Sequence, residues 1–138
     1  MSDNKEAALC MAVYDRVDTA LAGLEDLDQL HKDDLIGKYD AAVVDVEGGK
    51  PHVVKRMDRP RIRVIPEDFG GGALPRKELK EVAEELHGDE AGLIVLGEPT
   101  IEKAFDKAVQ GAAKVVKRSL DITTDEIARG LQEAAKAS

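Results

Sequence analysis

Residues 7–14, AALCMAVY, form the longest uninterrupted apolar run of the chain, and residues 91–96, AGLIVL, form a second such run. Each run leads into a segment with apolar residues at intervals of three and four, which predicts an amphipathic helix. Each helix is followed by a run in which valines alternate with polar residues, at 40–46 and 114–120. Two strand-helix-strand units in one chain are typical of a duplicated α+β fold.

The two kinds of strand differ in a way that predicts their places in the sheet. Residues 8–14 and 91–96 are apolar at both alternating sets of positions, as expected of strands covered on both faces. The other two strands carry Asp, Lys, Arg and Ser between their valines. We therefore expect the first pair at the centre and the second pair at the periphery, as in a ferredoxin-like sandwich. The two long helices would cover one face, and added helices or a second copy of the chain would cover the other.

The whole chain of 138 residues fits one domain, because a chain of this length buries roughly two-thirds of its unfolded surface. The helices of the two units are expected to begin near Val17 and Ile101. Thr123 to Glu126 form a capping box that opens a last helix. The expected parts are repeat one at 7–47, a basic hairpin and glycine loop at 48–75, an added helix at 76–88, repeat two at 91–121 and a C-terminal helix at 123–137.

Composition excludes several classes of protein. The net charge of −8 opposes general attraction to nucleic acid or anionic lipid, and two Tyr and two Phe are too few for a base-stacking or flavin site. A single cysteine excludes an internal disulfide, and the first residues lack the apolar run of a signal peptide. The longest apolar run is far shorter than the roughly 20 residues that span a bilayer. We therefore expect a cytoplasmic protein with no membrane segment.

Basic charge is concentrated between the repeats. Residues 50–63 have a net charge of +5, whereas the rest of the chain has −13. A turn at 48–51 makes 52–57 the expected hairpin partner of the preceding strand. Guanidinium groups suit phosphate or carboxylate, but pairing with the acidic helices, including Glu81, Glu84 and Glu85, explains them more simply. The candidate anion or partner contacts are Lys55, Arg56, Arg59, Arg61, Arg63, Arg76 and Lys77.

Arg76 and Lys77 follow three glycines, Gly70 to Gly72. Backbone N–H groups of such a loop can bind phosphate, yet the spacing fits neither a P-loop nor a dinucleotide fingerprint. The glycines are more simply a flexible connector.

Five short segments accompany this order of elements: VYD at 13–15, ALAGL at 20–24, YDAAVV at 39–44, AGLIVL at 91–96 and VVKRSL at 115–120. Together they resemble the bacterial domain-of-unknown-function family numbered 1269, over most of the chain. Members often have a long glycine-rich apolar segment between the two halves and are described as membrane proteins. Here that place holds only FGGGALP at 69–75. The resemblance thus implies the fold, without a membrane segment and without catalytic residues.

The three histidines have carboxylates near them in the sequence. Imidazole and carboxylate are ordinary metal ligands, but the spacing matches no metal motif. Two of the histidines fall near predicted helix C-termini, where the helix dipole favours them. We therefore assign no metal site and no cofactor to the groups considered: His31 with Asp33 and Asp34, His52, and His87 with Asp89 and Glu90.

No residue is assigned a catalytic role. Cys10 lies in the most apolar strand, where a buried thiol is ordinary and a reactive one is not. Tyr14 and Asp15 end the first strand, and Glu98 has the matching place in the second unit. This pair of acidic corners suits an acid and a base, but helix capping explains both more simply.

These observations favour a non-enzymatic, self-associating binding or regulatory protein of unknown process. We expect a symmetric homodimer that buries part of the sheet face or of the added helices, and an acidic protein partner for the basic segment. The alternative is a binder or enzyme for a small anion, such as phosphate or a nucleotide, that uses the basic hairpin and glycine loop. No nucleic acid or membrane partner is expected.

Overall fold

The computed structural model of the chain describes residues 6–32, 39–47, 50–57, 84–120, 123–127 and 129. Residues 58–75 of the expected basic hairpin and glycine loop, and most of both added helices, lie outside these residues. Seven elements follow one another along the described chain: β1 (Ala8–Tyr14), α1 (Val17–Lys32), β2 (Tyr39–Glu47), β3 (Lys50–Arg56), β4 (Ala91–Gly97), α3 (Ile101–Ala108) and β5 (Lys114–Ser119).

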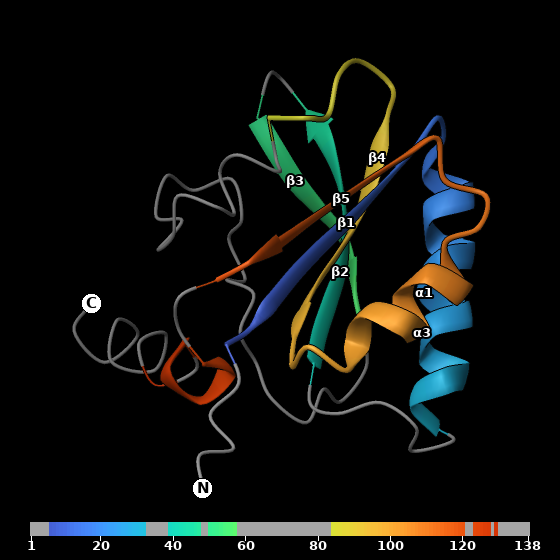
Figure 1. The fold of residues 1–138 in the computed structure, drawn as a ribbon. Helices are drawn as coiled ribbons and strands as arrows, with labels where there is room; N and C mark the ends of the chain where they lie inside the picture. The colour runs from blue at the N-terminus through green and yellow to red at the C-terminus, as the bar shows by residue number, and fades with distance from the viewer. Residues whose placement is uncertain are drawn as a thin grey trace, which may run out of the picture.

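The strands form one antiparallel sheet in the order β3-β2-β4-β1-β5. The protein is therefore an α+β protein, and α1 and α3 lie together on one face of the sheet (Figure 1). β1 and β4 occupy its centre and are buried along their whole length, which confirms the position predicted from their apolar runs.

β2 is not a peripheral strand, so that prediction was wrong. Its outer side pairs with β3, the predicted hairpin partner, and this hairpin takes the edge of the sheet instead. Residues 39–44 are consequently buried on both faces, including the carboxylate of Asp40. On the other side of the sheet, β5 is an edge strand as expected, and nearly all of its residues are exposed.

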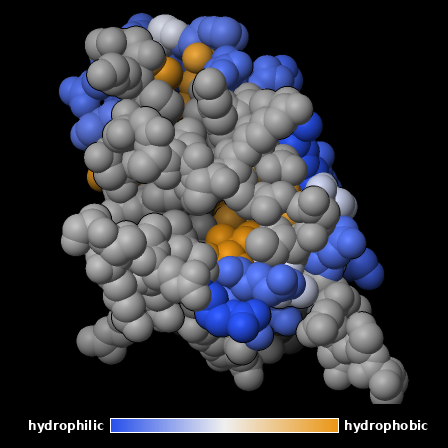
Figure 2. Space-filling view, turned by 90° about the vertical axis from the view of Figure 1, so that its left-hand side faces the viewer, coloured by the Kyte–Doolittle hydropathy of each residue, from blue (hydrophilic) through white to orange (hydrophobic). Residues whose placement is uncertain are grey.

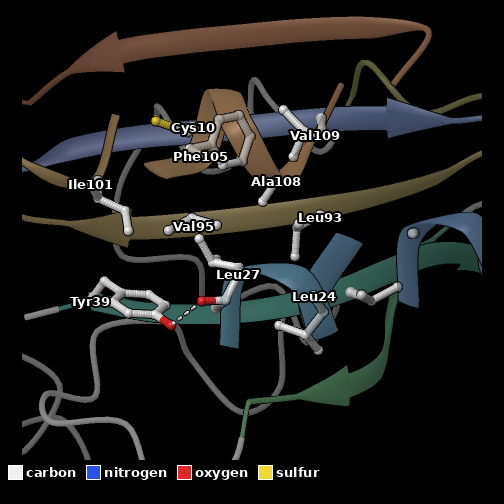
Figure 3. Packing of buried hydrophobic residues seen from close by; sticks show 14 of the residues in the cluster. Cys10, Leu24, Leu27, Tyr39, Leu93, Val95, Ile101, Phe105, Ala108 and Val109 are labelled. Carbon is white, nitrogen blue, oxygen red and sulfur yellow. Dashed lines mark hydrogen bonds between the residues drawn. The ribbon is translucent and has the colours of Figure 1, made fainter. Parts of the chain in front are cut away.

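The main core lies between the sheet and the two helices (Figure 3). Leu24 and Leu27 of α1 and Phe105 of α3 pack on the strand residues that face them, such as Val95. Full burial of a Leu or Phe side chain contributes about 1.5–3 kcal/mol, so this layer contributes strongly to stability. Both helical stripes predicted from the sequence are confirmed, because residues 101, 104, 105 and 108 of α3 are also buried.

The opposite face of the sheet carries a second apolar cluster. Leu9 and Met11 of β1 lie there beside Ile94 and Leu96 of β4, and all four side chains are fully buried within a single chain. Figure 2 views this side of the molecule, and among the residues that it colours the apolar side chains show as small patches. These side chains are thus buried without a second copy of the chain, and the dimer expected through this face or the added helices stays a prediction.

Two local predictions are also confirmed. Thr123 and Glu126 form the expected capping box, since the Glu126 N–H donates to Thr123 Oγ1 at 3.3 Å and the Thr123 N–H donates to Glu126 Oε1 at 3.3 Å. Ile127 then contributes to the second apolar cluster. Among the described residues, no helix is long and apolar enough to cross a membrane.

Candidate functional site

The structure describes two of the seven predicted anion or partner contacts. Lys55 is exposed on β3, whereas Arg56 is largely buried and its Nη2 donates to Asp40 Oδ2 at 2.9 Å. Asp40 is itself fully buried, so Arg56 neutralises a carboxylate of its own chain. The remaining five candidates lie outside the described residues: Arg59, Arg61, Arg63, Arg76 and Lys77.

Cys10 is fully buried, as predicted. Burial raises the pKa of its thiol to about 12, and the nearby carboxylate of Glu102 acts in the same direction. The thiolate is the nucleophilic form of cysteine, so this thiol is unreactive near neutral pH. Figure 3 shows it beside Phe105, in the buried cluster, which is the place of a small core residue.

The two acidic corners cannot act together. β1 and β4 are antiparallel, with Tyr14 opposite Ala91 and Ala8 opposite Gly97. Asp15 therefore lies at one end of the sheet and Glu98 at the other, separated by roughly 20 Å along a seven-residue strand. The hypothesis that these two carboxylates form an acid and base pair was wrong, because β1 and β4 run in opposite directions and therefore end at opposite ends of the sheet.

Carboxylates gather at the end of the sheet where β1 and β2 finish and β4 begins. Ala91 lies there between Tyr14 of β1 and Asp45 of β2. An open pocket of about 320 Å³ lies beside them, and it has four carboxylates and a single guanidinium in its wall. The lining residues are Asp15, Arg16, Val17, Asp45, Val46, Gly88, Asp89 and Glu90.

One histidine joins this group through the β2–β3 hairpin. His52 lies directly opposite Asp45, and Glu47 lies two residues further along β2, on the same face of the strand. His52 Nδ1 is 3.1 Å from Asp45 Oδ1 and 3.0 Å from Glu47 Oε2. The three side chains offer one nitrogen and two kinds of carboxylate oxygen within 4.8 Å of one another. This donor set is one that divalent metals use.

The sequence prediction gave His52 without these partners. A hairpin drawn with Gly48 and Gly49 as its two turn residues, rather than with the predicted turn at 48–51, puts Asp45 opposite His52, which is the observed register. Another histidine has a different role: the backbone N–H of His87 donates to Glu90 Oε1 at 2.8 Å, which holds the turn before β4. The side chain of His31 lies outside the described residues, with Asp33 and Asp34.

Comparison with known proteins assigns no family, because no protein-family model, no curated protein and no solved structure matches the chain.

Proposed function

We propose that the protein is a non-enzymatic, self-associating binding or regulatory protein of the cytoplasm with a ferredoxin-like duplicated fold. The fold proposal is supported by the order β2-β4-β1-β5, in which the first strand of each unit lies inside and pairs with the second strand of the other unit. The proposal of a non-catalytic role is supported by Cys10, which is buried, and by Asp15 and Glu98, which lie at opposite ends of the sheet.

The open edge of β5 is the observation that carries self-association. Among the residues that the structure describes, β5 pairs with β1 on one side and no strand lies beyond it on the other. The Leu120 N–H donates to Ala7 O at 2.9 Å, in line with the register of the two strands. Because bonded pairs alternate in an antiparallel ladder, residues 115, 117 and 119 turn their backbone groups outward. Such an edge is a template for pairing with another strand.

A two-fold axis normal to the sheet restricts how two β5 strands can pair. Residues that lie opposite each other in the two strands must point to the same face of the sheet. The axis therefore lies midway between one residue and the same residue of the second copy. An axis at Lys117 or Arg118 would oppose like charges directly, and an axis at Val116 would place Lys114 opposite Arg118. An axis at Val115 avoids all of these repulsions. Val115 is also 42 % exposed, and the pairing would bury it.

The lysines of β5 lie against carboxylates of their own chain, which lowers the electrostatic repulsion between two β5 strands that pair. Lys114 Nζ lies 3.0 Å from Glu85 Oε2, and Lys117 Nζ lies 2.7 Å from Asp106 Oδ1. The hydrogen bond to Asp106 raises the pKa of Lys117. Both pairs are partly exposed, so they direct the side chains more than they stabilise the fold.

The basic segment at 50–63 supports the second part of the proposal, an acidic protein partner. Its charge of +5 in a chain with −13 elsewhere favours a local contact with an acidic surface. Membership of the family numbered 1269 remains a proposal as well. The small-anion alternative gains no support from the described contacts, because Arg56 binds Asp40.

Substitution of Val115 tests the proposed edge. The N–H of Val115 points away from β1, so Val115→Pro removes an outward donor while leaving the β1–β5 bonds in place. Val115→Lys places two charges at the two-fold axis, and Val115→Thr is the control that keeps both shape and backbone. Light scattering should show a dimer for the parent and the Thr variant and a monomer for the Pro and Lys variants. A parent dimer that all three variants retain would exclude this edge.

A further inference from the structure

We propose that Asp45, Glu47 and His52 bind one borderline divalent cation, such as Zn²⁺ or Co²⁺. His52 Nδ1 lies 3.1 Å from Asp45 Oδ1 and 3.0 Å from Glu47 Oε2, and the set spans at most 4.8 Å. Neighbouring ligands of an ion bound at about 2.0–2.2 Å are themselves roughly 3.0–3.5 Å apart. An ion can therefore be held with small side-chain adjustments.

The backbone fixes the relative positions of the three ligands. Asp45 and His52 are cross-strand partners, and Glu47 shares their face of the hairpin. The pairs Val46 with Pro51 and Glu47 with Lys50 continue the ladder to the end of the hairpin. A site on paired strands is held more precisely than one on a loop.

The surrounding charge favours a cation. Asp45 also lines the pocket at the end of the sheet, together with the carboxylates of Asp15, Asp89 and Glu90. Arg16 is the one basic residue in that wall, so the pocket is strongly acidic. A carboxylate patch alone would suit Mg²⁺ or Ca²⁺, which prefer oxygen ligands. The imidazole nitrogen is what favours Zn²⁺ or Co²⁺ over these ions.

The site is open to solvent. The side chains of His52, Asp45 and Glu47 are 52 %, 25 % and 67 % exposed. Three protein ligands leave at least one coordination position free for water or for another ligand, unlike the four ligands of a closed structural zinc site. The ion should therefore exchange readily, and a chelator should remove it without unfolding the protein.

Titration of the tag-free full-length chain with Zn²⁺ and with Co²⁺ tests the proposal. We expect one ion per chain, a visible Co²⁺ absorption spectrum, and Zn²⁺-induced shifts of the His52 ring signals in NMR spectra. His52→Ala and Asp45→Asn should each weaken binding at least tenfold. The controls are His87→Ala, which removes another exposed histidine, and Asp125→Asn, which removes an exposed carboxylate from the C-terminal helix; both should bind as the parent does.

Three results would overturn the proposal. The first is the absence of saturable Zn²⁺ and Co²⁺ binding to the parent. The second is unchanged affinity in His52→Ala, with circular dichroism showing that the variant is folded. The third is Mg²⁺ binding as tight as Zn²⁺ binding with no effect on the His52 ring, since this would assign the cation to the acidic pocket alone.

Discussion

Gly23 of α1 lies directly over the hydroxyl of Tyr14 at the end of β1, and a Cβ placed on Gly23 would be 2.6 Å from Tyr14 Oη. The helix needs glycine here because the tyrosine occupies the space of a side chain. Tyr14 is buried, and its hydroxyl has no hydrogen-bond partner among the described residues. Burial also raises the pKa of this tyrosine. The helix therefore contacts the strand through a hydroxyl group that makes no hydrogen bond to a described residue.

Gly23→Ala should destabilise the protein by about 1–2 kcal/mol, because the cost of overpacking exceeds the gain in helix propensity. In a Tyr14→Phe background the same change should cost less, because the 2.6 Å contact is gone and the contacts that remain, to the ring Cζ and to Leu93 Cδ2, are 3.3 and 3.4 Å. Urea denaturation of the four proteins measures this difference. Equal effects of Gly23→Ala in both backgrounds would show that the hydroxyl is not the obstacle.

The buried pair of Asp40 and Arg56 gives a second prediction. Asp40 is fully buried and Arg56 Nη2 lies 2.9 Å from its Oδ2, so loss of the carboxylate removes this ion pair from a largely buried guanidinium. Asp40→Asn should cost about 3–5 kcal/mol in the free energy of unfolding. Asp40→Leu combined with Arg56→Met should cost less than the sum of the single changes.

Asp125→Asn, at an exposed carboxylate, is the matched control and should change stability by less than about 0.5 kcal/mol. Additive effects of the Asp40 and Arg56 changes would contradict the coupling.

The raised pKa of Cys10 predicts that the protein loses stability in alkaline solution. Its pKa rises from 9.0 to about 12 on folding, mainly by burial, so the folded state keeps a proton that the unfolded state releases. The contribution of the protonated thiol to the free energy of unfolding is complete below pH 9 and is lost as the pH rises toward 12. Cys10→Ala should therefore lose less stability over this range than the parent does. Tyr14 and Tyr39 also have raised pKa values, so some loss should remain in the variant.

Thiol labelling gives an independent check, because a buried thiol reacts only when the protein opens. Parallel pH profiles of parent and variant, or rapid labelling of the native protein, would contradict this account.

The sequence predicted the elements whose pattern was strong and local. The apolar runs at 8–14 and 91–96 predicted two central strands, and the three-and-four spacing after Val17 and Ile101 predicted both helices. The place of β2 was missed because its Asp40 reads as a solvent-facing residue. Its burial depends on Arg56, 16 residues further along the chain, and a pattern confined to one strand cannot reveal that pairing.

The candidate site was less predictable, for the same physical reason. His52 and Asp45 are seven residues apart and meet only through the register of the hairpin. The pocket depends on three segments that the sheet order brings together, with Asp15, Asp45 and Glu90 coming from different parts of the chain. The composition predicted that the basic segment would make the contacts on which function depends. In the described residues the carboxylates around His52 and the pocket form the candidate site instead.

The mass of the parent protein in solution tests self-association most directly. Sedimentation equilibrium over micromolar to millimolar concentrations, at low and moderate salt, would give that mass without a label or a surface. The open β5 edge and the exposed Val115 predict a reversible equilibrium that approaches twice the mass of one chain as concentration rises. A single-chain mass throughout the range would contradict the claim.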